Sequence, residues 1–225
     1  MLVKEDIHLL EEGLSFWDNL SDQQKEKLIY NSKRFHYEPS ASIHCGENDC
    51  IGVILVKKGT VRTYILSEAG KEITLYRLHP LEVCVLSASC ILDSITFDVH
   101  MDAETSCDII QINSATYSQL QRENIYVDNF TYRIITERFS DVMWAMQQIL
   151  FMSFDKRLAA FLIDESLNTN SNIINLTHEQ IAKYIGSARE VVSRMLKYFA
   201  NEGWVTLSRG GIEIIDKKKL RSILR

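Results

Sequence analysis

The chain has no hydrophobic stretch long enough to cross a membrane, because its longest apolar run covers only residues 51–56 of 225. A membrane-spanning helix needs about 20 mostly apolar residues. The first six residues, MLVKED, also lack the basic start and apolar block of a secretory signal. We therefore expect a cytoplasmic protein, with enough chain for one large or two modest domains.

Cysteine and histidine are few and scattered. The five cysteines are an odd number without a repeated spacing, which favours reduced thiols. None of the six histidines forms an H-x-H or H-x-x-x-H pair, the pattern expected where a β-barrel holds a catalytic metal. We therefore predict neither a metal site nor an enzyme.

Residues 35–112 have the composition of many short strands joined by turns. Residues 52–56, 60–66 and 73–78 are apolar or β-branched runs, and glycines stand in the connections between them. Short helices are expected before the strands, with a helix start at residues 20–23. Several short strands with regular turns favour a jelly-roll β-barrel.

Glycine and proline are absent from residues 118–152, where the apolar pattern becomes helical. Two sets of residues recur every seven positions and form a seam over about four heptads, flawed only at Asp128. The seam favours a second copy of the chain as partner, and the alternative is a helix lying on its own barrel. Phe130, Ile134 and Met143 lie off the seam and are expected to contact the barrel. The seam residues are Ile125, Tyr132, Ile135, Phe139, Val142, Met146 and Ile149.

Residues 176–204 carry the strongest motif in the chain. Thr177 with Gln180, and Ser187 with Glu190, each have the spacing at which a hydroxyl and a polar side chain cap a helix reciprocally. Apolar residues at helical spacing follow each start, and Gly186 lies between the two segments, where a tight turn benefits from positive φ. This arrangement predicts a helix-turn-helix, whose second helix can enter the major groove of DNA.

The polar face of the second predicted helix has side chains suited to bases. Arginine can donate two hydrogen bonds to guanine, and glutamate can accept one from the cytosine amino group. Other side chains of the motif suit phosphates, which position a protein without specifying sequence. A solvated helix face, with Glu190 only completing a cap, is the alternative. The predicted base-reading residues are Arg189, Glu190, Ser193 and Arg194, and the predicted backbone contacts are Thr177, His178, Lys197 and Arg209.

A β-hairpin is predicted behind this motif. Gly203 is expected to end the second helix in a left-handed conformation. Residues 204–207 and 212–215 are β-rich runs around a Gly-Gly turn, with Arg209 at the tip. Such a hairpin is typical of a wing, and residues 217–219 are expected to begin a last, solvated helix.

Charge is divided unevenly along the chain. Residues 153–225 carry a net charge of +4, whereas residues 1–152 carry −9. A basic module on an acidic body favours local attraction to phosphates. We expect an α+β fold in three parts: an effector-sensing β-barrel domain over residues 1–117, a dimerisation helix over residues 118–152 and a winged helix-turn-helix over residues 153–225.

This order of parts resembles the Crp–Fnr family of bacterial transcription regulators. Residues 43–47, 56–61 and 68–72 look like barrel turns of the family, and residues 186–194 resemble its recognition helix. The similarity covers nearly the whole chain. It implies a homodimer that binds a palindromic operator in double-stranded DNA and contacts RNA polymerase.

The predicted recognition helix combines two branches of that family. By position, Arg189, Glu190 and Arg194 match the base-reading residues of the cyclic-AMP receptor branch. Ser193 and Arg194 also match the Fnr-like branch. The resemblance therefore implies half-sites with a G·C pair contacted by Arg194.

The positions that hold ribose, phosphate and adenine in the nucleotide-binding branch carry other residues here. A buried phosphate needs a cation or a ring of donors, and the aromatic and acidic residues at the phosphate position provide neither. Cyclic AMP is therefore not expected. The six positions, which we predict to line an effector pocket, are Val85, Leu86, Phe97, Asp98, Val142 and Met143.

The resemblance also bears on two other cofactors of the family, an iron–sulfur cluster and haem. An iron–sulfur cluster is not expected, because residues 1–44 contain no cysteine. Haem is not predicted, since Ser87 stands where the haem-binding branch has histidine, although His79 and His100 stay open as axial ligands.

Cys84 and Cys90 flank the predicted pocket, which makes a thiol redox switch a further hypothesis. An apolar or aromatic small molecule is another. Two alternatives to a signal-responsive regulator stay open: a cupin-type barrel enzyme with an appended DNA-binding module, and a DNA-binding protein that needs no effector. The lack of histidine pairs weighs against the enzyme.

Overall fold

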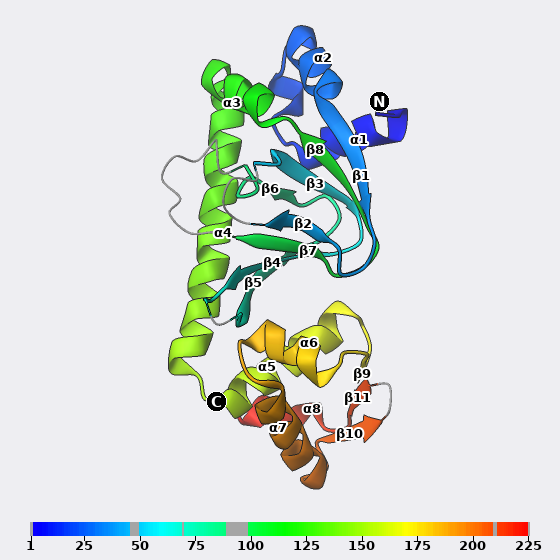
Figure 1. Cartoon of the computed structure of the whole chain (residues 1–225), viewed down its shortest axis with the longest axis vertical. Coiled ribbons are helices and arrows are strands. Elements are labelled where there is room, and N and C mark those ends of the chain that lie inside the picture. The colour runs from blue at the N-terminus through cyan, green and yellow to red at the C-terminus, as the bar shows by residue number, and fades with distance from the viewer. Residues whose placement is uncertain (1, 46–49, 69, 89–98, 209–210, 225) are drawn as a thin grey trace. The chain divides into compact units, whose positions relative to one another are not determined.

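The chain folds into two compact units (Figure 1). The first contains Met1–Leu66 and Leu75–Val142, and the second contains Ser67–Thr74 and Met143–Arg225. No helix in the described part of the chain is long and apolar enough to span a bilayer. The computed structural model describes residues 2–45, 50–68, 70–88, 99–208 and 211–224.

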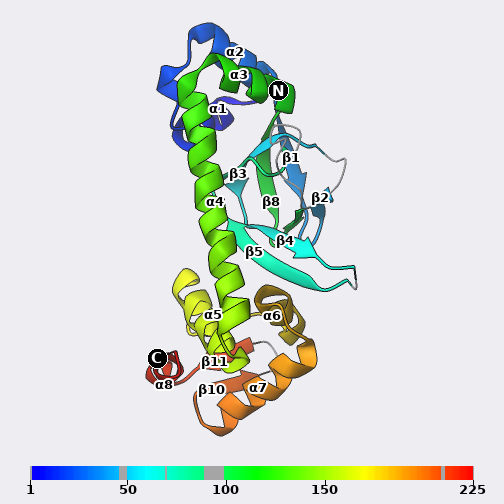
Figure 2. The same ribbon diagram turned by 90° about the vertical axis from the view of Figure 1, so that its left-hand side faces the viewer.

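Two four-stranded sheets form the barrel of the first unit (Figures 1 and 2). Their strands are short, and most neighbours are antiparallel. This confirms the predicted jelly-roll-like barrel. One sheet has the order β1 (Ser32–Tyr37), β8 (Cys107–Ile112), β3 (Val53–Lys58) and β6 (Val83–Cys84). The other has the order β2 (Ser42–Cys45), β7 (His100–Ala103), β4 (Val61–Leu66) and β5 (Glu72–Leu78).

The barrel encloses an apolar core. Ile54, Val56, Met101 and Ile109 are completely buried members of it. Val56 stands opposite Ile109 in the register of β3 and β8, so side chains from paired positions fill the same interior. This burial of alternating strand residues explains why the β-rich runs of residues 35–112 fold together.

Helices cover one side of the barrel. α1 (Lys4–Gly13), the short helix η1 (Trp17–Asn19), α2 (Asp22–Tyr30) and α3 (Ser114–Glu123) share a second apolar core with β3 and β8. The predicted start at residues 20–23 is confirmed, because Ser21 caps α2 by accepting a hydrogen bond from the Gln24 N–H.

The predicted helix over residues 118–152 is divided in two. α3 ends at Glu123, and α4 (Ile125–Phe151) begins after Asn124, whose backbone is extended. The Asn124 side chain stabilises the break, since its oxygen accepts from the Tyr126 N–H at 3.0 Å and its amide donates to the Asn19 carbonyl at 3.0 Å. The prediction of one continuous helix was therefore wrong at this residue.

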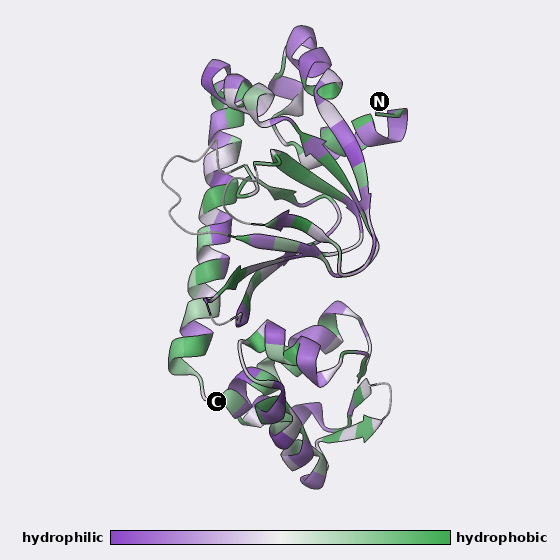
Figure 3. Cartoon of the chain, viewed as in Figure 1, coloured by the Kyte–Doolittle hydropathy of each residue, from purple (hydrophilic) through white to green (hydrophobic). Residues whose placement is uncertain are grey.

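Apolar residues occur along the length of α4 (Figure 3), and they differ in burial. Phe130 and Ile134 are buried in the core of the first unit, as predicted for off-seam residues, whereas Met143 is 40% exposed. Among the predicted seam residues, Ile135, Val142 and Ile149 are half-buried. The others remain exposed by 46–63%: Ile125, Tyr132, Phe139 and Met146.

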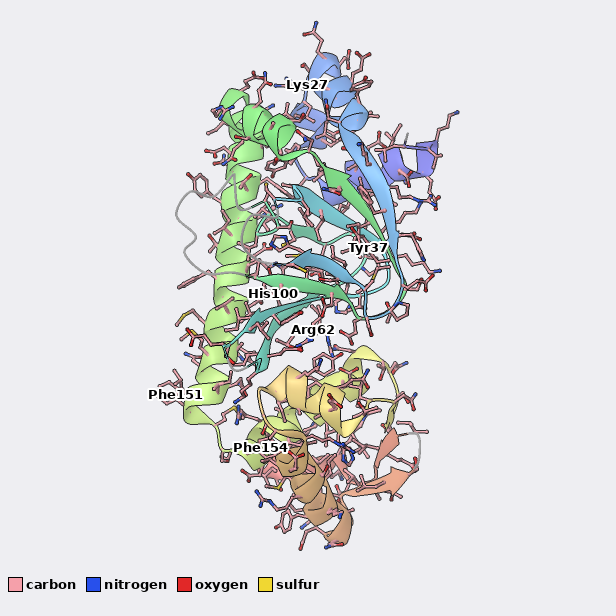
Figure 4. All side chains as sticks on the ribbon, viewed as in Figure 1. Lys27, Tyr37, Arg62, His100, Phe151 and Phe154 are labelled. Atoms are coloured by element: carbon pink, nitrogen blue, oxygen red, sulfur yellow. The ribbon has the colours of Figure 1, made fainter. Side chains whose placement is uncertain are left out.

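The second unit is mainly helical. Phe151 ends α4, and Phe154 begins α5 (Phe154–Asn168) (Figure 4). A three-stranded sheet has the order β10 (Val205–Ser208), β11 (Gly211–Ile214) and β9 (Ile173–Ile174), of which β9 was not predicted. The remaining elements are α6 (His178–Ile185), α7 (Arg189–Asn201) and α8 (Lys217–Ser222).

Candidate nucleic-acid interface

The start and end of α6 follow the sequence prediction. Thr177 Oγ1 accepts from the Gln180 N–H at 3.1 Å, and Gln180 Oε1 accepts from the Thr177 N–H at 2.8 Å. This reciprocal pair satisfies two backbone donors that a helix leaves open. Gly186 ends the helix in the left-handed region at φ 62°, where a side chain would be strained.

The start of α7 differs from the prediction. Its N-cap is Ala188, which makes no side-chain capping bond, so the expected box of Ser187 and Glu190 is wrong. The Ser187 N–H instead donates to the Ala182 carbonyl at 2.9 Å and completes the end of α6. Glu190 is therefore exposed in the first turn of α7 without a capping role.

One face of α7 is buried and the other is open. Val192, Leu196 and Phe199 are completely buried in the core of the second unit, which fixes the rotation of the helix. The opposite face lines a shallow groove of about 540 Å³. The residues that line it are Arg189, Glu190, Ser193, Arg194, Lys197, Tyr198 and Asn201. All four predicted base-reading residues thus lie on one surface.

His178 and Ser193 connect α6 to this surface. His178 Nδ1 lies 2.8 Å from Ser193 Oγ, at a partly buried position. Burial lowers the pKa of the His178 imidazole, and the positive charges of Arg189 and Lys197 lower it further. Both effects disfavour the protonated ring.

The wing is formed by β10 and β11. Val205 pairs with Ile214 and Ser208 with Gly211, which confirms the predicted hairpin. Arg209, the predicted contact at its tip, lies outside the described residues. Gly203 has φ 74° after the end of α7, also as predicted. The predicted last helix is α8, which Asp216 caps.

Comparisons with known proteins agree with this geometry. The family described as Crp-like helix-turn-helix domain matches residues 156–223. A crystal structure of a transcriptional regulator of the Crp/Fnr family from Eubacterium rectale is 44% identical, covers 95% of this chain and 99% of its own, and has a TM-score of 0.91. The chain belongs to the Crp/Fnr family of transcription regulators.

More distant relatives include a transcriptional activator and a cyclic AMP receptor protein. The transcriptional activator protein anr of Pseudomonas aeruginosa is 24% identical and covers 75% of this chain and 70% of its own length. The cyclic AMP receptor protein of Thermus thermophilus is 25% identical and covers 75% of this chain and 77% of its own. DNA binding through the helix-turn-helix is thus a property that this chain shares with its family.

The structure describes only some of the residues that are predicted to line the effector pocket. Val85 is completely buried, and Leu86 is 7% exposed. Val142 packs against the barrel core, whereas Met143 is 40% exposed. Phe97 and Asp98 lie outside the described residues.

The structure adds a polar cluster that sequence reasoning missed. Arg138 of α4 is 8% exposed, and its guanidinium lies 4.9 Å from the Tyr76 ring centre. Its charge is balanced by Asp141 at 2.8 Å and Glu82 at 3.6 Å. These partners come from α4 and from the loop after β5, and no spacing along the chain signals that they meet.

The proposed redox residues have different surroundings. Cys84 is completely buried beside Tyr76, with Sγ 3.7 Å from the phenol oxygen. Burial raises the pKa of the Cys84 thiol, which disfavours the reactive thiolate. Cys90 lies outside the described residues. Cys50 is in a disulfide, contrary to the expectation of reduced thiols, whereas Cys45, Cys84 and Cys107 are free.

The two histidines considered for haem have different surroundings: the His79 N–H donates to Glu82 Oε2 at 2.7 Å. His100 stacks on Tyr64 with ring centres 5.4 Å apart, and His79 is exposed. Within the described ranges, no three His, Cys, Asp or Glu side chains gather closely enough to hold a metal ion.

Proposed function

We propose that this Crp/Fnr regulator is a homodimer that binds a palindromic operator with two copies of α7. The open face of α7 carries this proposal, because it presents two arginines, a glutamate and a serine. None of these four side chains is used to cap the start of the helix. Arg189, Glu190, Ser193 and Arg194 would contact base edges. Thr177, His178, Lys197 and Arg209 would contact the sugar-phosphate backbone.

Dimerisation is supported by the exposed apolar seam of α4. Ile125, Tyr132, Phe139 and Met146 recur every seven residues and are each about half exposed or more. Coiled-coil pairing would remove these side chains from water. A two-fold axis would place the two α7 helices about one duplex turn apart.

The first unit would report a signal to the DNA-binding part. We propose the domain division of residues 1–117, 118–152 and 153–225, with the effector pocket at Val85, Leu86 and Val142. The effector is a small molecule other than cyclic AMP, or a redox signal. The protein would act in the cytoplasm, with RNA polymerase as a partner and without catalysis.

The test is selection of operators from a library of randomised palindromic duplexes. The wild-type chain should enrich half-sites that contain a G·C pair. Arg194→Ala should lose about 1–3 kcal/mol of binding to that half-site, or roughly 5- to 150-fold, because a bidentate contact to guanine is removed. Binding to duplexes without the site should change little.

Arg221→Ala is the matched control, since Arg221 is an exposed arginine of α8 outside the groove. It should leave operator preference unchanged. Equal effects of the two variants, or no enrichment of any duplex, would contradict the proposal. Affinity that is the same in crude extract and after purification would instead favour a DNA-binding protein without an effector.

A further inference from the structure

A hydrogen bond joins the first residue of α6 to the open face of α7. His178 Nδ1 and Ser193 Oγ are 2.8 Å apart. No hydrogen-bond partner of His178 Nε2 occurs among the described residues. One ring nitrogen is thus committed to a side chain of the DNA-binding face, and the other is available.

The direction of this bond determines what Ser193 can offer to a base. A neutral imidazole carries one N–H. If the proton is on Nδ1, the ring donates to Ser193, and the hydroxyl hydrogen is left for a base. If the proton is on Nε2, Nδ1 accepts the Ser193 hydrogen, and only oxygen lone pairs are left for a base.

We propose that His178 is a positioning residue that makes Ser193 an acceptor-only reader of DNA bases. This inference rests on the proposed binding of α7 in the major groove. In that arrangement the first helix of the motif crosses the sugar-phosphate backbone, where an Nε2 proton meets phosphate oxygens. A phosphate therefore selects the tautomer in which Nδ1 accepts from Ser193.

The consequence is a base preference at one operator position. An acceptor-only hydroxyl can bond the amino group of adenine or cytosine. Guanine and thymine present no amino group in the major groove, and their oxygens would face the Ser193 oxygen without a hydrogen between them. The position contacted by Ser193 should thus favour adenine or cytosine over guanine or thymine.

Two substitutions of His178 separate its two bonds. In His178→Gln the amide lies near the place of Nε2, so the phosphate contact is kept and the acceptor for Ser193 is lost. In His178→Asn the amide lies near the place of Nδ1, so the acceptor is kept and the phosphate contact is lost. Glu179→Gln is the control, because Glu179 is exposed beside His178 on the same helix.

The experiment measures the affinity of the full-length chain for its selected operator with each of the four bases at every half-site position. Ser193→Ala should abolish the preference at one position, which identifies the base that Ser193 contacts. At that position, His178→Gln should lower the preference for adenine or cytosine roughly 3- to 10-fold. In a chain that already carries Ser193→Ala, His178→Gln should not change the base preference further. His178→Asn should keep the preference and weaken all operators equally.

The inference is overturned if the wild type prefers guanine or thymine at that position, or if His178→Gln keeps the wild-type preference. It is also overturned if His178→Asn loses the preference as His178→Gln does, since the ring would then act only through folding. Failure of the wild type to select any duplex would overturn the proposed function itself, and this inference with it.

Discussion

At the residue scale, an ion pair attaches α1 to the barrel. Lys57 Nζ lies 2.8 Å from Asp6 Oδ1 and 2.9 Å from Glu5 Oε2, and the Val3 N–H donates to Asp6 Oδ2 at 3.0 Å. Asp6 is only 1% exposed, so its charge needs these partners. Burial raises the pKa of Asp6, but the bonds from Lys57 and Val3 outweigh burial and hold the pKa below its usual value.

Lys57→Ala should therefore lower the free energy of unfolding of the first unit by about 1–3 kcal/mol, because a buried carboxylate loses a charged donor. The wild-type pair stabilises the fold above the usual carboxyl pKa near 3.8, and this contribution is lost as pH falls through the lower folded value. Urea unfolding between about pH 7 and about pH 3 should thus show less acid sensitivity in the variant. Lys58→Ala, at an exposed neighbour, is the control.

Sequence reasoning succeeded at residues whose partners are local. Thr177 and Gln180 are three positions apart, and their cap formed as predicted. The cap at Ser187 failed because its N–H bonds Ala182 behind it, a competition that spacing alone does not reveal. The bond from His178 was missed because its partner lies fifteen residues away on another helix.

At the element scale, the turn between α6 and α7 depends on Gly186. Its φ of 62° lies in the left-handed region that a side chain disfavours by roughly 1–2 kcal/mol. Gly186→Ala should lower the free energy of unfolding of the second unit by about that amount, and its thermal midpoint should fall accordingly. Gly186→Asn should recover part of the loss, since asparagine tolerates this conformation. Equal midpoints for the alanine and asparagine variants would show that φ is not what requires glycine here.

Element types were predictable where hydrophobic periodicity is strong, and element ends were less so. The wing strands and α7 follow from their apolar patterns. The break at Asn124 was missed, because it depends on a bond to the Asn19 carbonyl, a contact between distant segments. β9 was missed because two residues are too short to show a period, and its pairing with β11 is tertiary.

At the scale of the whole molecule, α4 buries some of its apolar residues and leaves others exposed. Phe130 and Ile134 contact the chain's own core, which confirms that α4 lies on its own barrel, whereas the second copy stays a proposal. Tyr132 and Phe139 are 61% and 62% exposed, and the described chain does not cover them. Such a large apolar stripe on a helix favours a second copy as its partner.

Phe139→Glu tests this partner directly. In a two-fold dimer the variant would place two carboxylates near each other in an apolar seam, where both lose hydration. Sedimentation should show monomers, and operator affinity should fall because the two α7 helices no longer bind together. Trp144→Glu changes another exposed aromatic residue of α4, 55% exposed but off the seam, and should leave the dimer intact. A Phe139→Glu chain that sediments as a dimer would place the interface elsewhere.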